Sequence, residues 1–124
     1  MWPPPSTSPP GRDLQAVRPG VKPLDAVPAH VPLNRAKAAL FRTLGHPVRI
    51  RVLELLRDGP RVVRELLDDV EVEASSLSQQ LAVLRREGLV TSQRRGLAVE
   101  YQLATPEVEG LLTAARDLLD HLKS

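Results

Sequence analysis

The chain has 124 residues and a formal net charge of +2, with 17 Lys and Arg against 15 Asp and Glu. It contains no cysteine, which excludes disulfides, thiolate metal sites and cysteine nucleophiles, and with one Trp, one Tyr and one Phe its core must be aliphatic. No apolar run approaches the roughly 20 residues of a membrane span, and the N-terminus lacks the basic and apolar regions of a signal peptide. We therefore expect a cytoplasmic protein with no membrane partner.

Residues 1–32 form a proline-rich segment that holds nine of the twelve prolines. Proline lacks an amide donor and has a fixed φ, so this segment is predicted to form neither helices nor paired strands. We expect a disordered, partly polyproline-II tail, with a ligand for a proline-recognition domain as the alternative. A single folded domain is predicted over residues 33–124.

Three helices are predicted in the first half of this domain. Apolar residues recur at helical spacing between residues 33 and 44, and Gly45 ends this helix. Pro47, in the tolerated first turn, opens a second helix that the sequence Asp58-Gly59-Pro60 stops. A third, short helix is predicted over about residues 62–69, followed by a turn.

The fourth predicted helix, residues 74–87, has an unusual composition for a surface helix. At about 100° per residue, Leu77, Leu81 and Leu84 form one narrow apolar stripe. Four side chains lie directly opposite and two more flank them: Ser75, Gln79, Ala82 and Arg86, then Ser76 and Ser78. No charged residue occurs between residues 74 and 84, whereas a solvated helix face usually carries Glu and Lys.

After Gly88 the apolar period changes from that of a helix to that of a strand. Residues 90–103 are predicted to form a β-hairpin that turns at Arg95-Gly96. A hydroxyl N-cap, a proline and an acid, Thr105-Pro106-Glu107, then begin a last helix. Its apolar stripe is long and comprises Val108, Leu111, Leu112, Ala115, Leu118, Leu119 and Leu122.

These elements predict a mainly α fold with a small β-hairpin, of the α+β class. The third and fourth helices with their turn form a helix-turn-helix, and the hairpin follows where a winged variant places its wing. Short Ser and Gln side chains let a helix approach a surface closely, and they donate and accept hydrogen bonds as base edges in a major groove require. Arg86, and Arg94 and Arg95 at the hairpin tip, are predicted to hold phosphates or to enter a minor groove. A solvated or partner-binding face is the alternative.

Three segments resemble the ArsR/SmtB family of bacterial winged-helix repressors. "LGHPVRIRVLELL" at residues 44–56 is similar to the family's L-x-H-P-x-R-L-x-I-L-x-L-L segment, and "SSLSQQLAVLRREGLV" at residues 75–90 is similar to its recognition helix. "QRRGLAVEYQL" at residues 93–103 resembles its R-R-x-G-R-x-V-x-Y-x-L wing, although Leu97 stands where the family often has Arg. The resemblance covers about residues 33–122.

The resemblance implies a homodimeric transcriptional repressor that binds a palindromic operator through the fourth helix. It implies DNA contacts by Ser75, Ser76, Ser78 and Gln79, and it implies a contact by Gln80 as well. It also implies a dimer interface between the first and last helices, whose apolar stripes suit that role independently. The residues concerned are Leu33, Leu40, Val108, Leu111, Leu112, Ala115, Leu118, Leu119 and Leu122. Intramolecular packing of part of each stripe is the alternative.

Members of this family often release DNA when they bind a metal. The thiolate site of the family's third helix has no counterpart here, because "VRELLDDV" contains no Cys. On the last helix Asp117 and His121 are spaced i, i+4 and share a face, so one such pair from each chain of a dimer would offer four ligands to nickel or zinc. The alternative is a solvated helix end, where His suits the helix dipole. We expect a regulator that has no metal cofactor.

Enzymatic activity is not expected. No histidine lies near the serine cluster in sequence, no phosphate-binding loop is present, and the acids are scattered as helix surface charges. The predicted partners are double-stranded DNA and a second copy of the chain. Two alternatives are a winged-helix protein-interaction module and a sensor of nickel or zinc that acts through the last helix.

Overall fold

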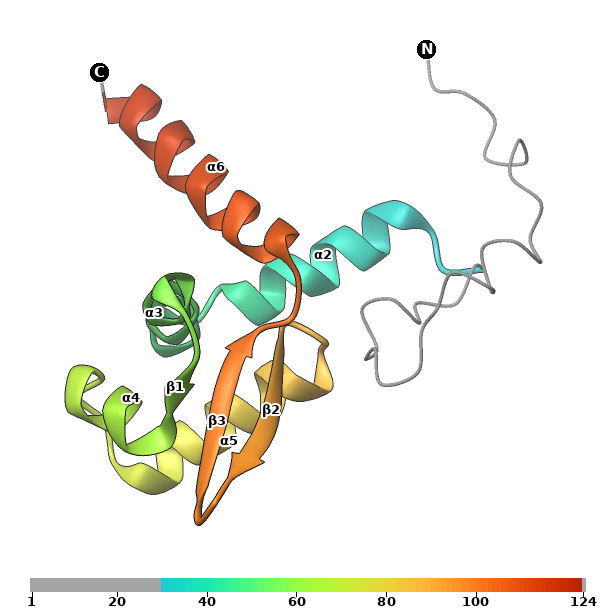
Figure 1. The fold of residues 1–124 in the computed structure, drawn as a ribbon. Helices are drawn as coiled ribbons and strands as arrows, with labels where there is room; N and C mark the ends of the chain where they lie inside the picture. Colours follow the sequence, from blue (N-terminus) through green and yellow to red (C-terminus); the bar gives the residue numbers. More distant parts are fainter. Residues whose placement is uncertain (1–29, 124) are drawn as a thin grey trace.

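The computed structural model describes residues 30–123, beginning three residues before the first helix (Figure 1). The segment predicted to be a disordered tail lies outside the described residues, except for its last three. The elements follow in the order of a winged helix-turn-helix: helices, a two-strand wing and a closing helix. The predicted fold class is therefore confirmed.

Two helices open the described chain. α2 (Leu33–Leu44) ends at Gly45, as predicted. α3 (Pro47–Leu55) begins after His46, whose Nδ1 accepts a hydrogen bond from the Val48 N–H at 3.2 Å. This imidazole satisfies an amide that has no helical partner, the role that Ser or Asp usually plays at a helix N-terminus.

The segment between α3 and the next helix differs from the prediction. A 3-10 turn, Leu56–Asp58, leads to β1 (Arg61–Val62), a strand that was not predicted. α4 (Val63–Asp69) follows at once and begins one residue later than expected. The Val62 N–H donates to the Glu65 carboxylate at 3.0 Å, which satisfies another unpaired amide at a helix start.

The remaining elements agree with the sequence pattern. α5 (Ala74–Arg86) completes the helix-turn-helix and ends one residue earlier than predicted. β2 (Val90–Arg95) and β3 (Ala98–Leu103) form the wing, and α6 (Pro106–Lys123) closes the chain.

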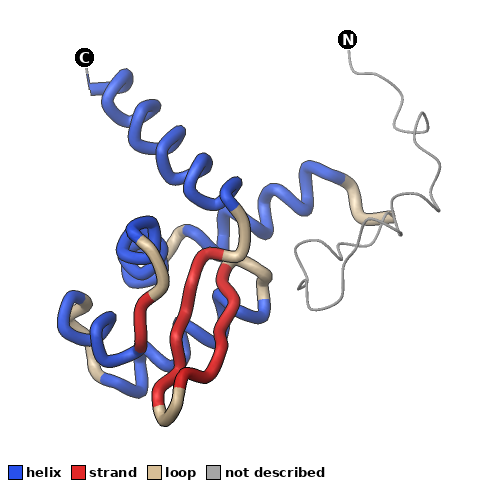
Figure 2. Tube along the Cα trace, in the orientation of Figure 1, coloured by secondary structure: helices blue, strands red, loops and turns tan. Residues whose placement is uncertain are grey.

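The sheet is antiparallel with the order β1-β3-β2 (Figure 2). β3 is the central strand: it pairs with β2 along its whole length and with β1 only at Glu100 and Tyr101. The pairing with β1 joins the start of α4 to the middle of β3. In Figure 1, α6 and the first turns of α2 extend on the side of the molecule opposite the hairpin tip.

The core is aliphatic, as the composition requires. Its buried side chains come from every helix and from β2: Leu44, Val52, Leu53, Leu55, Leu56, Leu66, Val70, Leu77, Leu81, Leu84, Leu89, Val90, Val108 and Leu112. Complete burial of one such Leu side chain stabilises a fold by about 1.5–3 kcal/mol. α5 contributes three of these leucines, so its orientation is set by the core.

Candidate nucleic-acid interface

α5 presents a polar face to solvent. Leu77, Leu81 and Leu84 are buried, with at most 1% of each residue exposed to solvent. The four residues on the opposite side of the helix, Ser75, Gln79, Ala82 and Arg86, are all exposed. The helical period therefore placed the apolar stripe and the outward face correctly.

The residues flanking this face differ in accessibility. Ser78 is exposed and Ser76 is half-buried. Gln80 is also half-buried, and its Oε1 accepts a hydrogen bond from Arg49 Nε at 2.8 Å. The carbonyl of Gln80 is thus engaged by α3, whereas Gln79 beside it points into solvent. The proposed contact of Gln80 with DNA remains a prediction.

The end of α5 is tied to the wing. Arg85 Nη1 donates to Ser92 Oγ of β2 at 3.2 Å, an exposed hydrogen bond between the helix and the hairpin. Arg86, the arginine predicted to hold a phosphate, has its Nε 3.7 Å from the Glu87 carboxylate. The side chains of Arg86 and Glu87 are 68% and 41% exposed, and such surface pairs contribute little to stability. Replacing the Glu87 carboxylate by a phosphate as the partner of Arg86 would therefore require little free energy.

The tip of the wing is a two-residue turn. Arg95 pairs with Ala98 in the strand register, so Gly96 and Leu97 alone connect the strands. Gly96 has φ +64°, a conformation that glycine adopts without strain. Arg94 and Arg95, predicted to lie at the tip, are instead the last two residues of β2. The tip itself carries a fully exposed leucine, Leu97.

Arg94 and Arg95 project from opposite faces of the hairpin, because side chains alternate along a strand. Arg95 Nε lies 3.3 Å from Glu100 Oε1 on the neighbouring strand. Among the described residues Arg94 forms no ion pair or side-chain hydrogen bond. Of the two wing arginines, Arg94 is therefore the one whose charge is not already offset.

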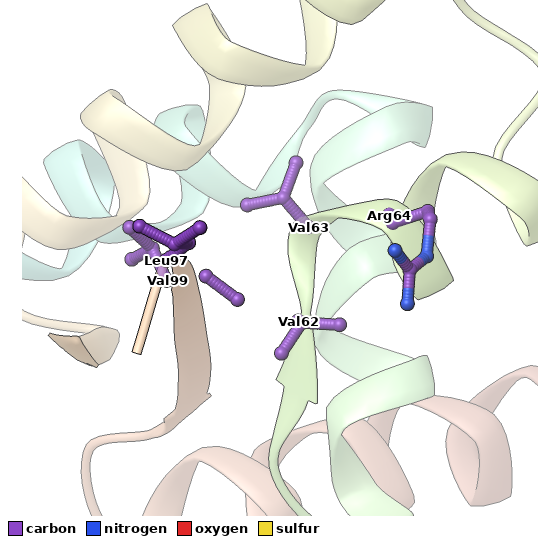
Figure 3. A pocket seen from close by; sticks show the side chains of 6 residues that line it. Val62, Val63, Arg64, Leu97 and Val99 are labelled. Atoms are coloured by element: carbon purple, nitrogen blue, oxygen red, sulfur yellow. The ribbon is translucent and has the colours of Figure 1, made fainter. Parts of the chain in front are cut away.

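A shallow apolar depression lies between the start of α4 and the wing tip (Figure 3). It has a volume of about 320 Å³ and is lined by Val62, Val63, Arg64, Leu97, Ala98 and Val99. Arg64 is its only charged side chain. Because none of these side chains has a carboxylate or an imidazole, the depression offers no side-chain ligands for a metal ion.

The two apolar stripes assigned to a dimer interface each divide into a buried and an exposed part. Val108 and Leu112, in the first turns of α6, are buried within the chain, and Leu40 and Leu111 are half-buried. The exposed members are Leu33, Ala115, Leu118, Leu119 and Leu122, joined by Phe41, which is 57% exposed. The exposed part lies on the distal turns of α6 and along α2, away from the wing.

The last helix, α6, carries the two residues predicted as candidate metal ligands. Asp117 and His121 are both exposed, and Asp117 lies 3.8 Å from Arg116. Within residues 30–123 no group of three or more His, Cys, Asp or Glu side chains comes together as a metal site would require. Asp117 and His121 are therefore a pair that a second chain would have to complete.

Sequence reasoning did not find the polar contacts that hold α5 and the wing in place. Arg49 lies far along the chain from Gln80, whereas Arg85 contacts Ser92 from a helix to a strand and Arg95 contacts Glu100 across two paired strands. No local pattern marks such pairs, because they exist only after the tertiary fold has formed. As for membranes, no helix in the described part of the chain has the length and apolar character needed to cross one.

Comparison with known proteins places this geometry in a family. Residues 46–92, which span α3, the helix-turn-helix and the first half of β2, match the family model described as "Bacterial regulatory protein, arsR family". The HTH-type transcriptional regulator Rv0081 of Mycobacterium tuberculosis is 51% identical over 94 residues, which cover 75% of this chain and 82% of that protein. The biofilm growth-associated repressor of Agrobacterium fabrum is 34% identical over 97 residues, covering 75% and 83% of the two chains.

Solved structures of similar proteins have the same fold. The crystal structure of Rv0081 superposes with a TM-score of 0.70, covering 73% of this chain and 92% of that chain. The homodimeric winged helix-turn-helix DNA-binding domain of Mb0332 from Mycobacterium bovis, 27% identical, superposes with a TM-score of 0.59 and covers 68% and 84%. The chain belongs to the arsR family of bacterial regulatory proteins and is a winged helix-turn-helix, DNA-binding transcriptional regulator.

Proposed function

We propose that this regulator is a homodimeric repressor that binds a palindromic operator, with α5 of each chain in the major groove. The observation that supports this most directly is the exposed face of α5, which is polar and uncharged over two turns. Ser75, Ser78 and Gln79 both donate and accept hydrogen bonds. Such side chains can read base edges, and because the leucine stripe lies opposite them they do so without disturbing the core.

The wing is proposed to contact the DNA backbone or the minor groove. Arg94 has a charge that no described carboxylate offsets, so it is the main candidate for a phosphate contact. Arg86, at the end of α5, is the second candidate. The described domain has nearly equal numbers of acidic and basic residues, so its attraction to DNA must come from such local arginines and not from bulk charge.

The dimer is proposed to form through the exposed parts of α2 and α6. Leu118, Leu119 and Leu122 on α6 and Leu33 and Phe41 on α2 are large apolar side chains, each at least half exposed. Large exposed apolar side chains gathered along a helix, as on α6, often mark a protein interface. Its place opposite the wing tip would leave the α5 helices of both chains free to contact DNA, and a twofold dimer requires a palindromic site. The similar Mb0332 domain is homodimeric.

Repression is proposed because a dimer bound across a promoter occludes it, and because the Agrobacterium fabrum relative carries a repressor's name. We further propose that the protein acts in the cytoplasm, catalyses no reaction, and needs no metal to bind DNA. The support for the last point is the chemistry of the chain: it has no Cys, and Asp117 with His121 is the only candidate pair on α6.

The test begins with selection of binding sites from a pool of random-sequence duplexes by the purified full chain. The selected sites should be palindromic, with half-sites about one helical turn or a multiple apart. Their affinity should fall steeply as salt rises. Failure to enrich any sequence would favour the protein-interaction alternative. A reporter behind the selected site should be expressed more strongly when the regulator is removed, and weaker expression would reject repression.

A further inference from the structure

Arg49 of α3 joins three helices through one guanidinium group. Its Nε donates to Gln80 Oε1 of α5 at 2.8 Å, and its Nη1 donates to the backbone carbonyl of Thr43 in α2 at 3.1 Å. Both bonds are partly buried. Arginine suits this role because its planar group has several donors in a fixed geometry, so one bond constrains the other.

The contact with α2 is at that helix's C-terminus. Thr43 is the penultimate residue of α2, so its carbonyl is one of the last four that have no partner within the helix. A cation at this end also interacts favourably with the helix dipole. Arg49 therefore satisfies an otherwise unpaired acceptor while holding the end of α2 beside α3.

The contact with α5 is made at the edge of its polar face, by a half-buried residue. Gln80 follows Gln79 directly and belongs to the same turn as the buried Leu81. Because an arginine can only donate, it must meet the carbonyl end of the Gln80 amide, which fixes the orientation of that side chain. The bond also restrains α5 against rotation and sliding, which the aliphatic contacts of its leucine stripe resist less specifically.

We propose that Arg49 is a positioning residue for DNA recognition, which sets the placement of α5 through Gln80 by reference to the C-terminus of α2. This inference rests on the proposed reading role of α5. It predicts that the operator affinity depends on a residue outside the reading face. Through Arg49, the C-terminus of α2 would therefore help to orient α5. The exposed face of the same helix, α2, is proposed to form part of the dimer interface.

The experiment compares variants of the full chain on a duplex selected by the wild-type protein and on a random duplex at the same salt. Arg49→Met removes both bonds, Gln80→Met removes only the bond to α5, and a double variant combines them. Arg51→Met is the matched control, because Arg51 is an exposed arginine two residues along α3 that forms no side-chain hydrogen bond or ion pair with another described residue. Sedimentation and circular dichroism check that each variant remains dimeric and folded.

We expect Arg49→Met and Gln80→Met each to weaken binding to the selected duplex on the order of tenfold, the size of one lost charge-assisted hydrogen bond. Binding to random DNA should change no more than in Arg51→Met. The double variant should be little worse than either single variant, because both remove the same link. Arg49→Lys, which keeps the charge but not the two-bond geometry, should restore only part of the affinity.

Two results would overturn the proposal. Additive losses in the double variant would mean that Gln80 contacts DNA independently of Arg49. An unchanged ratio of selected to random affinity in Arg49→Met would mean that the residue only supports the fold. The proposed function is judged separately by Gln79→Ala on the same duplexes. If Gln79→Ala lowers the ratio while the Arg49 variants do not, only the positioning role fails.

Discussion

Arg95 and Glu100 face each other across the wing, with Arg95 Nε 3.3 Å from Glu100 Oε1. The carboxylate is the less exposed partner, at 24% against 63% for the arginine. The wing therefore carries an acid that offsets one of its two arginines. This pairing distinguishes Arg95 from Arg94, which the sequence alone presents as equivalent.

Replacing Glu100 with Gln should strengthen DNA binding, because it releases the charge of Arg95. The slope of log affinity against log salt should steepen by about one unit, as expected for one further phosphate contact. Arg94→Ala should do the opposite and flatten that slope by about one unit. Glu107→Gln, which removes an equal charge at the start of α6, is the control. Equal effects of Glu100→Gln and Glu107→Gln would mean that net charge alone is responsible.

Dimerisation should depend on the distal turns of α6. Leu118 is 57% exposed in the single chain, so Leu118→Glu places a charge in the proposed interface without unfolding the domain. Analytical ultracentrifugation should then show a shift from dimer to monomer. Leu97→Glu introduces the same charge at a fully exposed leucine on the wing and should leave the dimer intact. A Leu118→Glu protein that sediments as wild type would place the interface elsewhere.

Leu81 joins the reading helix to the core, with 1% of the side chain exposed. Leu81→Ala should lower the free energy of unfolding by about 2–5 kcal/mol, through lost burial and the cavity left behind. Its neighbour Ala82 is exposed, and Ala82→Ser should change that free energy by less than about 0.5 kcal/mol. Urea unfolding at a single protein concentration measures both, since dimer stability depends on concentration. Similar values for the two variants would contradict the assignment of the helix faces.

Metal should have little effect on this regulator. Calorimetric titration of the dimer with zinc or nickel should give weak binding at most, and addition of either metal should not release DNA. His121→Ala should bind DNA with wild-type affinity, because His121 is an exposed residue at the far end of α6. Tight binding that His121→Ala abolishes, together with metal-induced release of DNA, would establish the last helix as a sensor site.

The helices and the wing were predictable from sequence because their apolar residues repeat at a helical or strand period. The exposed and buried faces of α5 follow from the positions of Leu77, Leu81 and Leu84 alone. β1 could not be predicted in this way, because two residues are too few to show a period. Its conformation is fixed by pairing with Glu100 and Tyr101, nearly forty residues along the chain.

The exposed residues of the candidate site were predictable from sequence, but the side-chain hydrogen bonds that hold its elements in place were not. The helical period of the apolar residues predicted that Ser75 and Gln79 face outward. It could not predict the hydrogen bonds from Arg49 to Gln80 and from Arg85 to Ser92. The stripe on α6 was recognised, and so was packing of part of it within the chain, but the turns that pack inside were not predicted. A helical period identifies an apolar face without showing which turns pack inside the chain, as Val108 and Leu112 do.

The central claim, that the polar face of α5 reads DNA sequence, is tested most directly by Gln79→Ala. Affinity of the wild-type and variant dimers should be measured on the selected duplex and on random DNA at one salt concentration. If Gln79 makes a bidentate base contact, the variant should lose about 1–3 kcal/mol on the selected duplex and almost nothing on random DNA. Wild-type affinity for the selected duplex in both Gln79→Ala and Ser75→Ala would contradict the account.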